Sequence, residues 1–256
     1  MADKKADYGE ISEVYDDARR ANAPHVAWWV AKLASEGRLG PGRQLLELGC
    51  GTGRWTLLLA ERTGCDAVGL DRSSAMLDKA RAKDTEGRVT WTEGDCERLT
   101  LAPNSFDCVL MSLVIHQLED QPAIVGEAFR LLRPGGICLI RQSTLEQLLD
   151  GPWFRFFPEV ITIERRRVPF RREIEHWMDS AGFDPVRVEV VKQRPHETNM
   201  QRLEEFQKRV TSSLRMISEE AYEAGMARLM AHLRRHTDDP TMRESLVTLF
   251  VGRKPE

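Results

Sequence analysis

The sequence predicts an α/β fold in which helices pack on a mainly parallel, doubly wound sheet. Short runs of apolar and β-branched residues alternate with longer amphipathic stretches along the 256 residues, as in successive βαβ units. A glycine-rich turn, "ELGCGTG" at 47–53, directly follows the first apolar run. Open sheets of this kind bind ligands at that turn. The length and composition suit one core, so we expect a single domain over residues 1–256.

Seven segments have the composition of strands. Each is a short apolar or β-branched run bounded by glycine, proline or polar residues. In chain order they are Gln44–Leu48, Asp66–Asp71, Val89–Glu93, Phe106–Met111, Ile137–Gln142, Val186–Val191 and Leu246–Val251.

Helices are expected in the intervals between these strands. One follows Gly53, and a second begins at Ser73, whose hydroxyl can cap the first turn. A third covers Pro122–Leu132 and a fourth covers Arg172–Ala181. The sequences "RPGG" and "AGF" supply the proline and glycine that end these last two helices.

Two segments fall outside the alternation. The N-terminal residues predict a helical cover of two helices broken at Pro24, and Asn199–His236 carries a long amphipathic pattern that Ser218 can interrupt as a cap. The predicted layout is a cover at 1–40, a core at 41–193, a helical insertion at 194–245 and a last strand at 246–256.

Composition and charge exclude several classes of function. A formal charge of −3 and a pI near 6.1 create no field that would gather nucleic acid or an anionic membrane. The five cysteines have no metal-ligand spacing, and no apolar run has the length of a signal sequence or a membrane span. We therefore expect a cytoplasmic protein without a metal, a nucleic-acid partner or a membrane partner.

The spacing of the glycines discriminates among cofactors. A dinucleotide fingerprint, G-x-G-x-x-G, fails because Arg54 and Thr56 stand where its third glycine belongs. A phosphate loop fails because no Lys-Ser or Lys-Thr pair follows the turn. Neither phosphate-binding pattern is present.

The turn instead resembles motif I of the class I S-adenosylmethionine-dependent methyltransferases, of the type that acts on small molecules. The resemblance continues in "VGLDRS", "EGDCERL", "FDCVLMSLVIHQLED" and "AFRLLRPGG", in the family's order. It implies a seven-stranded sheet whose last strand is antiparallel and lies between the fifth and sixth. It also implies S-adenosyl-L-methionine as the cofactor.

The resemblance further implies a set of cofactor-binding residues: Tyr15, Glu47, Gly49, Cys50, Gly51, Gly53, Asp71, Arg72, Met76, Asp95, Cys96 and Met111. Structural interpretations stay open beside it. Glu47 can simply hold the turn, Asp71 can cap the helix at Ser73, Met111 can belong to the core, and Tyr15 can anchor the N-terminal helix.

His116 is the candidate general base, because it follows the fourth strand where the resemblance places the methyl group, and imidazole can accept a proton near neutral pH. The alternative is a helix cap or pocket wall. The insertion would form a lid over the acceptor, with "TSSL" and the methionines Met200, Met216, Met226 and Met230 in its lining. The basic run at 165–172 is interpreted as a solvated connection.

The expected activity is in-line methyl transfer to a small organic acceptor through oxygen, nitrogen, carbon or sulfur. No N/D-P-P-Y-like motif follows the fourth strand, which disfavours nucleic-acid bases as acceptors. The rival functions are a cofactor-binding regulator or scaffold without chemistry and a nucleotide-dependent oxidoreductase. The amphipathic insertion is open to a second interpretation, the interface of a homodimer.

Overall fold

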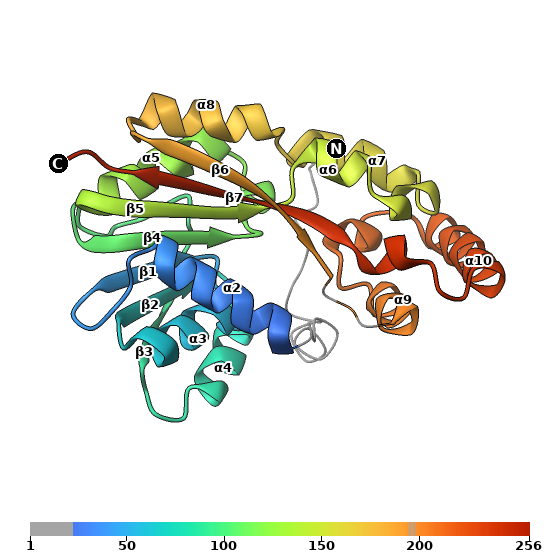
Figure 1. Cartoon of the computed structure of the whole chain (residues 1–256), viewed down its shortest axis with the longest axis horizontal. Coiled ribbons are helices and arrows are strands. Elements are labelled where there is room, and N and C mark those ends of the chain that lie inside the picture. Colours follow the sequence, from blue (N-terminus) through green and yellow to red (C-terminus); the bar gives the residue numbers. More distant parts are fainter. Residues whose placement is uncertain (1–22, 195, 197) are drawn as a thin grey trace.

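The computed structural model describes residues 23–194, 196 and 198–256. Its centre is one seven-stranded sheet of order β3-β2-β1-β4-β5-β7-β6, in which β7 pairs antiparallel with both β5 and β6 (Figure 1). The implied topology is thereby confirmed. The strands are β1 Gln44–Leu48, β2 Asp66–Asp71, β3 Val89–Glu93, β4 Phe106–Ser112, β5 Leu132–Gln142, β6 Val186–Gln193 and β7 Ser245–Arg253.

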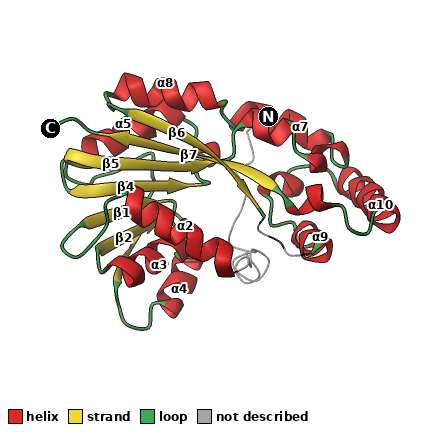
Figure 2. Ribbon diagram, in the orientation of Figure 1, coloured by secondary structure: helices red, strands yellow, loops and turns green. Residues whose placement is uncertain are grey.

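Alternating side chains of the central strands fill two separate cores. In β4, Val109 and Met111 pack toward α5 (Gln121–Leu131) and α8 (Arg171–Ala181), while Cys108 and Leu110 pack toward the opposite face. That face is covered by α2 (Ala23–Glu36) and α3 (Arg54–Thr63). Because successive side chains of a strand point to opposite faces, both faces of the sheet are apolar and both are covered by helices, as Figure 2 shows.

The predicted helix boundaries are close to those observed. Helix α4 (Ser74–Lys83) begins after Ser73, whose hydroxyl accepts a hydrogen bond from the Met76 amide, and α8 ends at Gly182. Helix α2 is described from Ala23 to Glu36 and includes Pro24. The helix predicted ahead of Pro24 lies outside the described residues.

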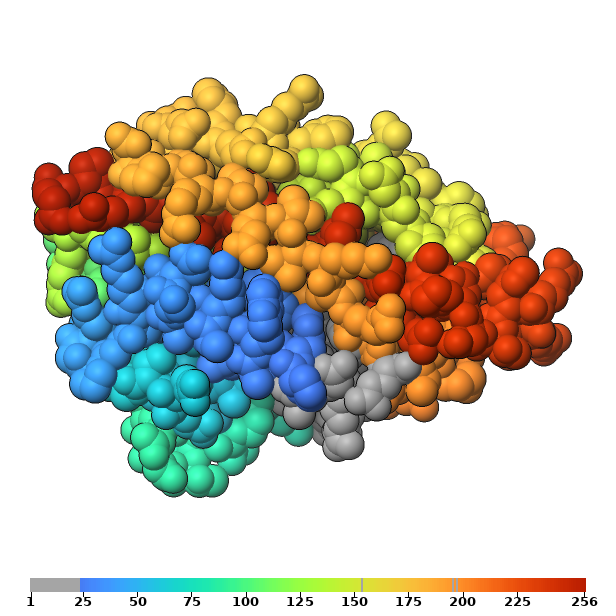
Figure 3. All heavy atoms as spheres, viewed as in Figure 1, coloured from blue at the N-terminus to red at the C-terminus, as the bar shows by residue number. Residues whose placement is uncertain are grey.

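A second body of helices stands beyond the carboxyl ends of the parallel strands. We call it the cap and define it as residues 145–168 and 198–243. It contains α6 Leu145–Leu149, α7 Glu159–Arg167, α9 Asn199–Gln207 and α10 Glu219–Arg235, with short 3-10 turns at Pro152–Arg155, Ser212–Arg215 and Pro240–Arg243. In Figures 1 and 3 these segments lie against one another at one end of the molecule.

The cap has a hydrophobic core of its own. Phe157 and Phe206 are fully buried there, and one comes from each of the two cap segments. Ser218 caps α10 by accepting a hydrogen bond from the Ala221 amide, as the sequence predicts. The predicted insertion at 194–245 therefore accounts for only one of the two segments, because α6 and α7 also belong to the cap.

Candidate active site

A cavity of about 700 Å³ lies between the carboxyl ends of the strands and the cap. We call the side formed by the turns after β1, β2 and β3 the strand-end half. Nine of the predicted cofactor residues line the cavity on this side: Glu47, Gly49, Cys50, Gly51, Asp71, Arg72, Asp95 and Cys96, with Met76 on α4. The other side, the cap half, includes Gln147, His196, Arg202, Glu205 and Thr211.

The three glycines of the first turn are required for different reasons. All have positive φ, which other L residues adopt at a cost. A Cβ on Gly49 would lie 2.3 Å from a Val114 methyl, and a Cβ on Gly53 would lie 2.3 Å from the Trp91 ring. A Cβ on Gly51 would meet nothing within 4 Å, and Gly51 lines the cavity. Gly49 and Gly53 therefore serve packing, whereas Gly51 leaves bare backbone for a ligand.

Asp71 ties the turn to the second strand. Its Oδ2 accepts a hydrogen bond of 2.7 Å from the Gly51 amide, and its Oδ1 accepts one of 2.9 Å from the Ser73 amide. The side chain lines the cavity while it holds these two backbone groups. Its predicted roles, as a ligand-facing acid and as a local structural acid, are geometrically compatible.

Glu47 is a buried acid at the end of β1. It shares a face of the sheet with Leu45 and accepts a short hydrogen bond from the hydroxyl of Thr56, a buried residue of α3. Burial raises the pKa of Glu47 to about 8, an effect that the Thr56 hydrogen bond opposes and the charge of Asp71 reinforces. A cationic ligand group in the cavity would relieve this cost.

Asp95 and Cys96 lie together after β3. Asp95 accepts a hydrogen bond from the Glu97 amide at 3.0 Å, and its exposed carboxylate lines the cavity. Burial raises the pKa of the Cys96 thiol to about 12 and holds the pKa of Cys50 still higher. Burial therefore favours the protonated thiol at both positions at neutral pH.

Four predicted residues do not lie where the sequence reasoning placed them or cannot be placed. Met111 is fully buried in the core and does not line the cavity. His116 lines a neighbouring cavity of about 510 Å³ beside Arg165 and Arg166, with its Nδ1 3.3 Å from Gln142 Oε1. Gly53 packs behind the turn. Tyr15 lies outside the described residues.

The predicted methionine lining of the lid is wrong. Met200 and Met230 are 60% and 38% exposed on the surface, and Met226 is buried in the cap core. Met216 lines the neighbouring cavity instead. From this segment it is Thr211, with Arg202 and Glu205, that lines the main cavity. The amphipathic pattern identified a buried face, but that face packs against the rest of the cap.

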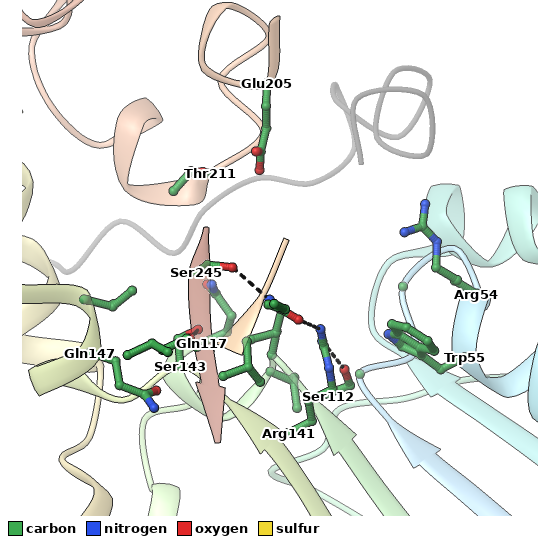
Figure 4. Close-up of a pocket in the computed structure, with 18 of the residues that line it drawn as sticks. Arg54, Trp55, Ser112, Gln117, Arg141, Ser143, Gln147, Glu205, Thr211 and Ser245 are labelled. Atoms are coloured by element: carbon green, nitrogen blue, oxygen red, sulfur yellow. Dashed lines mark hydrogen bonds between the residues drawn. The ribbon is translucent and has the colours of Figure 1, made fainter. Parts of the chain in front are cut away.

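Sequence reasoning missed Arg141, the last but one residue of β5, which lies on the same face of the sheet as Glu47. Its guanidinium lies 4.5 Å from the Trp29 ring centroid and 5.1 Å from that of Trp55, and donates hydrogen bonds of 3.3 Å to Ser112 Oγ and Gln193 Oε1. Figure 4 shows Arg141 beside Ser112, with the ring of Trp55 on the other side of Ser112. The sequence feature that could have identified Arg141 is a charged residue near the end of the otherwise apolar run "ICLIRQ".

The basic run is also more structured than expected. Arg165–Arg167 end α7 and Arg171 begins α8. Arg167 forms a largely buried ion pair of 2.8 Å with Glu164 and donates a 2.8 Å hydrogen bond to Ser212 Oγ, which joins the two cap segments. Arg165 and Arg166 are exposed, as the solvated interpretation requires.

Over residues 23–194, 196 and 198–256, no group of three or more histidine, cysteine or acidic side chains could hold a metal ion. In the same residues no helix has the length and apolarity that crossing a bilayer requires.

Residues 46–140 match the Methyltransferase domain family. The 2-phytyl-1,4-naphtoquinone methyltransferase of Thermosynechococcus vestitus is 33% identical over 159 residues, which cover 57% of this chain and 70% of that protein. The chain belongs to the class I S-adenosylmethionine-dependent methyltransferase family. The strand-end half fits the family's cofactor, because it combines the buried acid Glu47, the bare backbone of Gly51 and the acid Asp71.

Two further comparisons set the extent of the similarity. The malonyl-[acyl-carrier protein] O-methyltransferase of Serratia marcescens is 35% identical over 123 residues, or 47% of each protein, so this chain spans about half the length of that relative. A putative methyltransferase from an antibiotic biosynthesis pathway of Anabaena variabilis superposes with a TM-score of 0.75 at 19% identity, covering 92% of this chain and 99% of that one. The structural similarity shows the fold.

Proposed function

We propose that this chain transfers the methyl group of S-adenosylmethionine to a small organic acceptor inside the cavity. The observation that carries the proposal is the continuity of one cavity of about 700 Å³ across the strand-end half and the cap half. A volume of this size is typical of small-molecule sites. The acidic, bare-backbone strand-end half suits the cofactor, and the cap half is left for the acceptor.

The cofactor supplies an electrophilic methyl group on a sulfonium. The chain's own residues bind and orient it: Glu47 would take the amino group, Asp71 the ribose hydroxyls and Asp95 the adenine side. In the proposed complex the cap covers the bound reactants, excludes water from them and makes their surroundings less polar. Because positive charge is lost as the methyl group leaves the sulfonium, such a pocket favours transfer, and fixed positioning of the two reactants supplies much of the rate.

A hydroxylated aromatic compound is the first acceptor to test. The relative from Thermosynechococcus vestitus is named for a naphthoquinone substrate, and it is similar over more than half of this chain. The cap half presents the apolar side chains of Leu148 and Val247, and the aromatic ring of Trp55 lines the cavity from α3. These groups suit a flat apolar body with a polar edge.

The base for such an acceptor is a separate part of the proposal. His116, the candidate from the sequence, is next to Gln117, whose side chain lines the main cavity. A role for His116 would require its ring to turn from Gln142 toward that cavity. Replacing it by alanine should then lower turnover with little loss of cofactor affinity.

The test is a methyl-transfer assay with S-adenosylmethionine labelled in its methyl group and 1,4-naphthohydroquinone as acceptor, with a malonyl thioester as second acceptor. We expect label in an organic product at a rate proportional to enzyme concentration. Binding of S-adenosylhomocysteine without any label transfer would favour a cofactor-binding regulator. Absence of that binding would overturn the proposal altogether.

A further inference from the structure

Three described histidines lie in or near the main cavity, and only one is arranged as a base. His116 lines the neighbouring cavity, and burial with the charges of Arg141, His196 and Arg54 lowers the pKa of His25 to about 4. His196 lines the main cavity and is 4% exposed. We propose that His196 accepts the proton of the methyl acceptor, which therefore carries a weakly acidic hydroxyl group. This inference rests on the proposed function.

The contacts of His196 fix which ring nitrogen is free to act. Its Nε2 lies 2.9 Å from Glu205 Oε2, and the same oxygen accepts a 2.7 Å hydrogen bond from Arg202. A carboxylate oxygen can only accept, so Nε2 carries the proton and donates it to Glu205. The Arg202 to Nε2 contact of 3.4 Å joins two donors and is not a competing bond. The lone pair is therefore on Nδ1.

His196 Nδ1 has no hydrogen-bond partner in the described part of the chain, and its surface is buried. A buried acceptor without a partner is unfavourable, because it has lost its hydrogen bonds to water. A hydroxyl group of a bound ligand would satisfy it. The Glu205 carboxylate at the opposite nitrogen orients the ring and stabilises the imidazolium that proton transfer creates, the arrangement found in catalytic histidine–carboxylate pairs.

His196 and two arginines from the sheet side of the cavity act electrostatically on one cavity-lining residue, His25. The charges of Arg141, His196 and Arg54 all act on His25, and Arg141 also acts on Glu47 in the strand-end half. Arg54 begins α3 directly after the glycine turn. His196 is therefore close enough to His25 to affect its pKa, and Arg54 and Arg141 act on the same histidine.

The proposed step balances without another reactant. The acceptor oxygen attacks the methyl carbon, the oxygen–carbon bond forms and the carbon–sulfur bond breaks. The electron pair of the broken bond stays on sulfur as a neutral thioether, and the hydroxyl proton moves to His196 Nδ1. An acceptor without an ionisable hydrogen would gain nothing from this group, so the site selects phenols and hydroquinones over tertiary amines.

The test compares binding of 1-naphthol and naphthalene, measured by fluorescence with S-adenosylhomocysteine present, in the wild type, His196→Gln and His232→Gln. The control removes another histidine–carboxylate pair of the cap, His232 with Asp239 at 2.8 Å, which does not involve a cavity-lining histidine. We expect His196→Gln to weaken 1-naphthol about fivefold to tenfold, the value of one hydrogen bond, and to leave naphthalene unchanged. His232→Gln should change neither.

A second readout is independent of the acceptor. Nitrogen-15 spectra of the imidazole groups should show His196 protonated on Nε2 in the wild type and a redistribution between the two nitrogens in Glu205→Gln. Equal affinity of the wild type for 1-naphthol and naphthalene, or a parallel loss of both in His196→Gln, would overturn the proposal. If S-adenosylhomocysteine fails to bind the wild type, the proposed function fails first and independently of His196.

Discussion

The two halves of the cavity are built in different ways. The strand-end half comes from residues 47–97, and its groups are fixed by local backbone contacts such as those of Asp71 with Gly51 and Ser73. The cap half gathers residues from 147–152, 192–211 and 241–247, which only the packing of two distant segments brings together. In the proposed assignment, cofactor binding is therefore a property of a local stretch, whereas acceptor binding depends on the tertiary fold.

A substitution that weakens the cap core should show the largest difference in response between the two halves of the cavity. Phe206 is fully buried against Phe157, with ring centroids 5.7 Å apart, so Phe206→Ala should destabilise the cap by about 3–5 kcal/mol. Hydrogen exchange should accelerate in 199–207 and 219–235 while the sheet stays protected. Affinity for S-adenosylhomocysteine should persist. The matched control is Met230→Ala, at a 38% exposed position of α10. If Phe206→Ala, but not the control, lost affinity for the cofactor, the claim that the two halves are independent would be refuted.

A pair of glycine variants distinguishes packing from ligand contact within the strand-end half. Gly53→Ala forces a Cβ against Trp91 and should cost about 2–4 kcal/mol in unfolding free energy from crowding and positive φ. Gly51→Ala should lower the unfolding free energy by only about 1–2 kcal/mol, because of its positive φ, but its methyl group would enter the cavity. Urea unfolding should rank Gly53→Ala as the less stable, and Gly51→Ala should lose more cofactor affinity than stability. The reverse ranking would contradict the assignment.

Glu47 gives a smaller effect that depends on pH. Its pKa of about 8 in the folded protein lies above the ordinary value of 4.5, so the folded state holds the proton longer than the unfolded chain. The stability from this group is full below about pH 4.5 and declines as pH rises through 8. We expect the ligand-free Tm to fall between about pH 5 and pH 8 and to level off above, and Glu47→Gln to remove part of that decline. An identical decline in the variant would exclude Glu47 as its source.

The sequence predicts the sheet well because its signals are local. The segments that form β1, β2 and β3 can be recognised from their own residue composition. Gly51, Asp71 and Asp95 lie at or just after strand ends, where the family motifs apply. Boundaries shift by a few residues where pairing extends a strand, as in β6, which runs to Gln193 because it pairs with Ser245 of β7.

The cap half could not be predicted in the same way. Helices α6 and α7 lie in a stretch that has few helix signals and becomes ordered by packing Phe156 and Phe157 against α10. The His196 to Glu205 pair joins residues on either side of a helix start, and no spacing rule marks them as cavity-lining. The amphipathic pattern indicated burial without indicating which partner covers each face.

The most direct test of the cofactor assignment is a calorimetric titration with S-adenosylhomocysteine of the wild type, Asp71→Asn and Asp78→Asn. Asp78 is an exposed acid of α4 paired with Arg81 at 2.9 Å, outside the cavity. We expect one site in the wild type and in Asp78→Asn. Asp71→Asn should bind at least about tenfold more weakly, since hydrogen bonds to a charged group contribute about 1.5–3 kcal/mol. No binding to the wild type, or equal binding by all three proteins, would contradict the assignment of the strand-end half.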